Sequence, residues 1–69
     1  MKYTECRVSV YQQDERFGIR REYYDEGSFV SSEDGDALYD DFGTAKFEAE
    51  EYVETMNGES DDDRFKFVE

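Results

Sequence analysis

The residues of this chain that could do chemistry are almost all carboxylic acids. Its 69 residues include 20 Asp and Glu, no His and a single Cys, Cys6. Paired carboxylates can exchange protons with a substrate, but the commonest general base is His. A lone Cys without His makes a poor nucleophilic site, and neither a P-loop nor a G-x-G-x-x-G fingerprint occurs. We therefore expect a protein that is not an enzyme and that uses no cofactor.

Calcium binding is the other chemistry that many carboxylates offer. An EF-hand loop needs acidic residues at fixed spacing around a central Gly. Neither EDGDALYDDF nor GESDDD has that spacing, so we expect no dedicated metal site. A weak, irregular cation site near Asp34 and Asp36, or within residues 61–63, stays open as an alternative.

The charge is distributed unevenly along the chain, whose formal net charge is −12. Residues 22–63 hold sixteen acids and one base, whereas residues 1–21 hold three acids and five bases. Such an anionic block disfavours direct binding to nucleic acid, because proteins bind phosphates through Lys and Arg. It equally disfavours anionic membranes and favours a basic protein as the partner.

Length and composition predict one small compact domain, residues 1–69. Low hydrophobicity with high net charge is also the signature of disorder, but six Tyr and six Phe at regular spacing favour a folded chain. Cys6 is expected to be a small buried hydrophobe in a reducing compartment. No apolar run is long enough for a signal peptide or a membrane span. We therefore expect a cytoplasmic protein, and a monomer rather than a dimer.

Four short strands are predicted to position the acids. Residues 3–11 alternate apolar and polar side chains, which indicates a half-buried strand. Residues 17–24 predict a second strand in a hairpin with the first, and residues 28–31 predict a short third strand after a turn. Residues 64–68 alternate again and predict a final strand.

One amphipathic helix is predicted over residues 44–58, TAKFEAEEYVETMNG. Thr44 is the expected N-cap, and Asn57-Gly58 is the expected stop. Leu38 and Phe42 continue the apolar stripe backwards, so a helix that begins near Asp36 is also compatible with the pattern. In either case we expect these two side chains to anchor the segment to the core. The element order β-β-β-α-β predicts an α+β fold with a small antiparallel sheet and the helix packed on one face.

The helix face opposite the apolar stripe carries an excess of negative charge. Glu50 and Glu54 are four residues apart, and each like-charged pair at this spacing costs about 0.2–0.5 kcal/mol. Lys46 is the one base of the segment and is placed to reach Glu50. A helix built only for stability would contain more Lys, so the excess of acid favours a function. Solubility or halophilic adaptation is an alternative, but neither would spare residues 1–21.

Charge mimicry of nucleic acid is the function that this pattern favours. Duplex DNA carries one negative charge for about every 3.4 Å of axis on each strand. Carboxylates three or four positions apart on a helix lie about 5–6 Å apart, and alternate residues of a strand repeat at about 6.6 Å. Both spacings can present a dense anionic array to Lys and Arg that are placed for phosphates. Aromatic residues among the acids fit the centre of a protein interface.

In size, charge and layout the chain resembles the DNA-mimic inhibitors encoded by phages, which include anti-restriction proteins, uracil-DNA glycosylase inhibitors and small anti-CRISPR proteins. Its length and element order are most similar to those of anti-CRISPR proteins that act on type I Cascade complexes. No sequence motif carries the resemblance, so no residue role is transferred from it. It implies an inhibitor that binds the DNA-binding surface of a Cas complex and blocks target DNA in the bacterial host cytoplasm.

Two other functions remain open: a general acidic interaction module, such as an adaptor or chaperone of a basic protein, and a weak cation-binding or halophilic domain. The residues expected to bind the partner lie in the acidic segments and on the acidic side of the helix. They are Glu33, Asp34, Asp36, Asp40, Asp41, Phe47, Glu48, Glu50, Glu51, Glu54, Asp61, Asp62 and Asp63.

Overall fold

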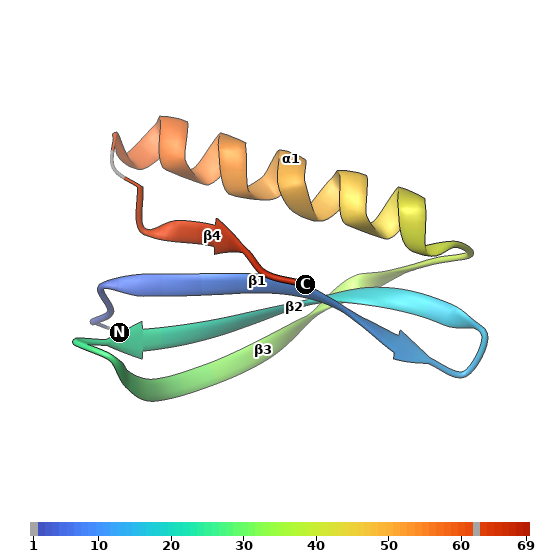
Figure 1. The fold of residues 1–69 in the computed structure, drawn as a ribbon, viewed down its shortest axis with the longest axis horizontal. Coiled ribbons are helices and arrows are strands. Elements are labelled where there is room, and N and C mark those ends of the chain that lie inside the picture. Colours follow the sequence, from blue (N-terminus) through green and yellow to red (C-terminus); the bar gives the residue numbers. More distant parts are fainter. Residues whose placement is uncertain (1, 62) are drawn as a thin grey trace.

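The computed structural model describes residues 2–61 and 63–69 of the chain. The elements are β1 (Glu5–Gln13), β2 (Arg16–Asp25), β3 (Ser28–Tyr39), α1 (Phe42–Ser60) and β4 (Phe65–Phe67). The four strands form one sheet in the order β3-β2-β1-β4, and α1 lies across one face of it (Figure 1). The predicted α+β fold and the order β-β-β-α-β are confirmed.

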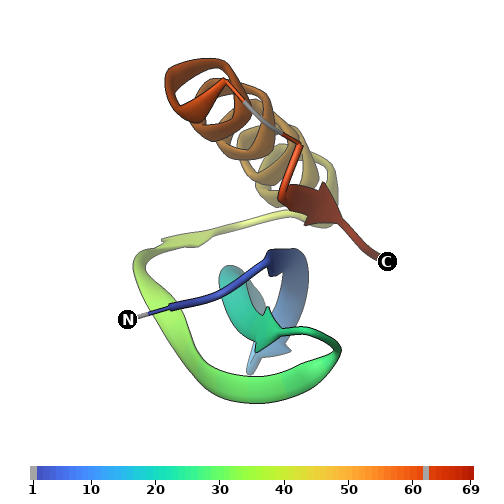
Figure 2. The same ribbon diagram turned by 90° about the vertical axis from the view of Figure 1, so that its left-hand side faces the viewer.

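The core lies between α1 and the helix-facing side of the β1–β2 hairpin. Alternation places Cys6 and Val8 of β1 on that side, where both are fully buried. Tyr23 stands opposite Cys6 in the register and is buried with it. Ala49 of α1 and Phe65 of β4 complete the cluster. Figure 2 shows α1 above this side of the sheet, and no element of the described chain covers the other side.

The acidic segment after the second turn is a long strand, not the start of the helix. β3 runs from Ser28 to Tyr39 and pairs antiparallel with β2 along its length. The pairing shifts twice, between Gly18 and Arg20 and between Tyr23 and Tyr24, which marks bulges in the ladder. The prediction of a strand limited to 28–31 was therefore too short. The sequence pattern of residues 32–39 is too weak to predict a strand. Their backbone groups are nevertheless hydrogen-bonded, because β2 pairs with β3 over this length.

Leu38 and Phe42 do not anchor to the core as predicted. Leu38 stands opposite Gly18 in the sheet and remains 37% exposed, and Phe42 is 45% exposed. Phe42 packs instead at the molecule's edge, where its ring meets that of Phe17 at 6.0 Å in an edge-to-face contact. Leu38 lies in β3, where side chains alternate with a period of two and the helical stripe does not continue. Phe42 is the first residue of α1 and lies at the end of its apolar stripe.

Both predicted ends of the helix were wrong by a few residues. Asp41, not Thr44, is the N-cap: Thr44 N donates to Asp41 Oδ2 at 2.9 Å. Thr44 Oγ1 also donates to Asp41 Oδ1, at 2.7 Å. The helix continues through Asn57-Gly58 to Ser60 and ends at Asp61, whose φ of 55° is left-handed.

Asn57 ties β4 to the helix instead of ending it. Its Nδ2 donates to Phe65 O, and its Oδ1 accepts from Phe65 N, both at 3.0 Å. β4 then pairs parallel with β1, with Cys6 opposite Phe65. The sheet is therefore mixed, whereas the sequence predicted an antiparallel one. An amide side chain that satisfies both backbone groups of Phe65 supports so short a strand on its helix-facing side.

Replacing Gly58 with Ala should stabilise the protein. Gly58 lies inside α1, is exposed, and has no atom within 4 Å of a Cβ placed there. A Gly in a helix interior costs about 0.5–1 kcal/mol relative to Ala. Urea denaturation should show a gain in the free energy of unfolding of that size for Gly58→Ala. A loss instead would mean that the helix ends at Gly58.

The protein should lose stability as the pH rises from 8 to 10. Burial raises the pKa of Cys6 from its ordinary value of 9.0 to about 11, and burial followed by the hydrogen bond to Glu33 also raises that of Tyr23. The unfolded chain therefore releases these protons first, and the thiol alone removes about 1 kcal/mol by pH 10. Urea midpoints at the two pH values measure the decline. It should be shallower in Cys6→Ala, and equal slopes would contradict a contribution from the thiol.

Candidate partner-binding surface

The exposed side of α1 carries four glutamates that the sequence analysis predicted to bind a partner. Ala45 and Ala49 are fully buried against the sheet, so residues on the opposite side of the helix point to solvent. We call these the acidic helix face: Glu48, Glu50, Glu51 and Glu54, all of them exposed. Phe47 lies among them and is 59% exposed. The predicted array of carboxylates with an aromatic residue inside it is thus present on one rigid element.

The one base of the helix is directed away from this face. Lys46 Nζ lies 2.9 Å from Glu69 Oε1, near the C-terminus of the chain. The hydrogen bond with Glu69 raises the pKa of Lys46, and the charge of Glu50 has a smaller effect in the same direction. The predicted contact of Lys46 with Glu50 is therefore replaced by an ion pair with Glu69. Among the described residues, no cation forms an ion pair with the acidic helix face.

Two of the predicted acids of β3, Asp34 and Glu33, point to opposite sides of the sheet and have partners within it. Asp34 stands opposite Arg20, and its Oδ1 lies 2.8 Å from Arg20 Nε. The hydrogen bond to Arg20 lowers the pKa of Asp34. Glu33, on the helix-facing side, accepts a hydrogen bond of 2.7 Å from the Tyr23 hydroxyl. These two carboxylates hold β3 to β2, and they do not lie on the surface that the acidic helix face forms.

The remaining predicted acids occupy the two ends of the helix and the edge of β3. Asp41 caps α1, and its bonds to Thr44 lower its pKa. Asp40 is almost fully exposed, with Arg16 Nε at 3.8 Å from its carboxylate. Asp61 forms the left-handed C-cap, and Asp63 is exposed beyond it. Asp62, also predicted, lies outside the described residues.

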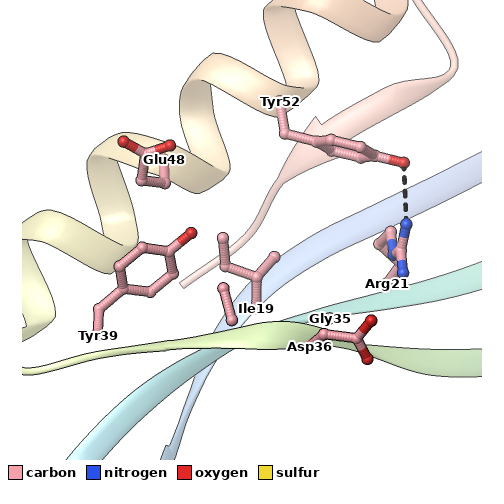
Figure 3. A pocket seen from close by; sticks show the side chains of 8 residues that line it. Ile19, Arg21, Gly35, Asp36, Tyr39, Glu48 and Tyr52 are labelled. Atoms are coloured by element: carbon pink, nitrogen blue, oxygen red, sulfur yellow. Dashed lines mark hydrogen bonds between the residues drawn. The ribbon is translucent and has the colours of Figure 1, made fainter.

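A cavity of about 330 Å³ lies between α1 and β3. The side chains that define it are Ile19, Arg21, Asp36, Tyr39, Glu48 and Tyr52. Figure 3 shows Tyr39 and Glu48 at one end of this space. Tyr52 and Arg21 lie at the other end, with Ile19 between the two groups. The carboxylate of Asp36 lies on the Arg21 side of the space, away from Glu48.

Arg21 is the residue of this region that sequence reasoning missed. Its Nη1 donates to the Tyr52 hydroxyl at 3.4 Å, its Nη2 lies 3.7 Å from Glu33, and its guanidinium carbon is 5.6 Å from the centre of the Tyr52 ring. The hydrogen bond to Tyr52 raises the pKa of Arg21. The alternation Ile19, Arg21, Tyr23 was the available signal, because it places a charge on the buried side of the strand.

The uncovered side of the sheet has a different chemistry. Arg7 stacks over the ring of Tyr24 at 4.0 Å, and Arg20 over that of Tyr11 at 4.6 Å. The Tyr11 ring lies so close to Gly18 that a Cβ there would approach it to 2.6 Å. These arginines also pair with acids, Arg7 with Glu5 at 3.2 Å. Four arginines thus lie in β1 and β2, whereas α1 has one base, Lys46.

Two further findings concern metal binding and membrane spans. Over residues 2–61 and 63–69, no group of three or more Cys, Asp and Glu is arranged to hold a metal ion. In the same part of the chain, no helix has the length and apolar character needed to cross a membrane. Comparison with protein-family models, with curated proteins and with solved structures found no match to this chain.

Proposed function

We propose that this protein is a non-enzymatic inhibitor that imitates nucleic acid and occupies the DNA-binding surface of a basic protein. The observation that carries the proposal is the acidic helix face, four exposed glutamates with no ion pair to a described cation. Carboxylates that no described cation neutralises are available to Lys and Arg of another protein. Burial of Ala45 and Ala49 fixes the rotation of α1 and so directs these carboxylates outward.

The arrangement of charge supports mimicry of nucleic acid more than a role in solubility. Three of the five arginines, Arg7, Arg20 and Arg21, are paired with acids of the sheet, whereas α1 has one Lys, which bonds to Glu69. Solubility would be served equally well by acids on either side. Segregation instead gives the molecule one strongly negative side, which attracts a basic groove over long range and weakens with added salt.

A CRISPR effector complex is the target that we propose to test first, because the chain resembles type I anti-CRISPR proteins in size, charge and layout. Phe47 would contact the partner at the centre of the glutamates, as aromatic residues do in protein interfaces. Asp40 and the acids beyond the helix, Asp61 and Asp63, would extend the negative surface past both ends of α1.

The decisive experiment is displacement of labelled target DNA from purified Cascade. The test variant carries Glu50→Gln, Glu51→Gln and Glu54→Gln on the helix, and the control carries Asp14→Asn, Glu15→Gln and Glu26→Gln in the two hairpin turns. Both sets change the net charge equally. The helix variant should need at least about tenfold more protein for half displacement, and the control should resemble the parent.

Equal effects of the two sets would reject a specific acidic surface, and circular dichroism would verify that both variants are folded. A partner captured in a complex that still binds DNA would favour the adaptor function over inhibition. Displacement should also weaken steeply between 50 and 300 mM NaCl, because the proposed contacts are between exposed charges.

Glu54→Lys should stabilise the protein while it reduces binding. The change converts two repulsive pairs, with Glu50 and Glu51, into attractive ones, and each pair is worth about 0.2–0.5 kcal/mol. Each conversion removes one such cost and adds one such gain, so urea denaturation at low salt should show a gain of about 0.8–2 kcal/mol. The same variant should displace DNA less well than the parent. A variant that gains stability and keeps full displacement would show that this part of the helix does not contact the target.

A further inference from the structure

The side of the sheet that faces away from α1 is a broad surface that no element of the described chain covers (Figure 2). We call it the open sheet face. Its residues alternate with the buried residues of β1, or stand opposite such residues in the register of the sheet. They are Glu5, Arg7, Tyr11, Arg20, Glu22, Tyr24, Phe29, Asp34, Leu38 and Lys66.

Aromatic rings and arginines dominate the centre of the open sheet face. The ring of Tyr24 carries Arg7 on its face at 4.0 Å and meets the ring of Phe29 at 5.7 Å. Phe29 itself is 57% exposed. Tyrosine, phenylalanine and arginine are enriched in protein interfaces. Because stacking already orders Arg7 and Arg20, a partner that binds here restricts these side chains little further.

The open sheet face is electrically balanced, although the net charge of the chain is −12. Three of its residues are bases and three are acids: Arg7, Arg20 and Lys66, and Glu5, Glu22 and Asp34. Nucleic acid would require an excess of bases, and a strongly charged protein would meet like charges. A second copy of this chain is suited to the surface, because its own open sheet face is balanced in the same way.

The positions of Arg7 and Glu22 make the open sheet face complementary to itself. The two residues stand opposite each other on β1 and β2. A two-fold axis that runs along the strands between β1 and β2 places Arg7 of each copy over Glu22 of the other. Glu22 forms no ion pair with a described cation. Glu5 engages two N–H groups of Arg7, and a guanidinium has further donors.

We propose that the protein forms a two-fold dimer through its open sheet faces, with an Arg7–Glu22 ion pair at each of two symmetric positions. This proposal replaces the monomer expected from the sequence and does not depend on the proposed function. Since α1 lies on the other side of each sheet (Figure 2), the two acidic helix faces point away from each other. If both proposals hold, one dimer can bind two targets at once.

The size of the open sheet face predicts a weak dimer. Nine residue pairs join β1 to β2, which corresponds to a length of about 30 Å, and four strands span about 15 Å. The footprint of about 450 Å² is smaller than the roughly 800 Å² that each partner buries in a standard interface. Each copy also carries a charge of −12, so salt should strengthen the dimer by screening the repulsion between copies.

Sedimentation equilibrium tests the dimer. The parent should approach the mass of two chains at high concentration, and its dissociation constant should fall at least about tenfold between roughly 50 and 500 mM NaCl. Glu22→Arg and Arg7→Glu should each remain monomeric where the parent is dimeric. An equal mixture of the two should dimerise again, because each variant supplies the charges that the other lacks. Glu54→Arg makes the same charge change on α1 and should not weaken the dimer.

Several results would overturn the proposal. They are a parent that stays monomeric at high salt, equal behaviour of Glu22→Arg and Glu54→Arg, and a mixture that does not recover. Growth beyond a dimer that disappears with added salt would indicate instead that an acidic helix face binds the sheet of another copy. Circular dichroism verifies folding. If Arg7→Glu does not fold, the comparison of Glu22→Arg with Glu54→Arg still decides.

The two proposals can fail separately. If the parent dimerises but the three-residue helix variant displaces DNA from Cascade as well as the parent does, the inhibitor function fails and the dimer stands. If that helix variant loses displacement while the parent is monomeric at every concentration, the dimer fails and the inhibitor function stands. The helix variant should itself dimerise at least as tightly as the parent, because its changes lie on the outer side of α1 and reduce the repulsion between copies.

Discussion

The packing of one helix stripe on the β1–β2 hairpin is the interaction on which the rest of this structure depends. Ala45 and Ala49 are small enough to bring α1 close to the sheet, where Cys6 and Val8 meet it without any exposure to solvent. Aromatic rings close the edges of this core, with Phe65 at 5.9 Å from Tyr52 and 6.1 Å from Tyr3. In a chain of 69 residues such a core leaves a narrow margin of stability. The free energy of folding must also exceed the electrostatic repulsion between the acidic side chains.

The distribution of the charges lets the protein remain stable and still expose many acids. The arginines of β1 and β2 lie against tyrosine rings and acids of the sheet, as Arg20 does with Tyr11 and Asp34. These pairs stabilise the strands and neutralise their share of the negative charge. In the part of the chain that the structure describes, no cation pairs with the acidic helix face, and the one lysine of the helix bonds to Glu69. Repulsion among these glutamates arises on an exposed face, where water and salt screen it.

The sequence predicted the element types better than their limits. Alternation in residues 3–11 identified β1 and its buried side correctly, since Cys6 and Val8 are in the core. The same rule failed for β3, because its bulges break the period of two. The strand extends to Tyr39 because it pairs with β2, which its own sequence does not reveal. The start of the helix was misplaced because Asp41 and Thr44 are both residue types that can cap a helix N-terminus. Only the geometry shows that Asp41, and not Thr44, accepts the hydrogen bonds.

The sequence by itself determined the fold class, the separation of an acidic block from a balanced N-terminal segment, and the outward glutamates of α1. These follow from local periodicity and from charge, which act over a few residues. The tertiary structure alone decided which acids remain available. It assigned Asp34 to Arg20 and Glu33 to Tyr23, and Lys46 to Glu69. Contacts between residues far apart in the chain depend on strand register and helix rotation, and the close packing of the core fixes both.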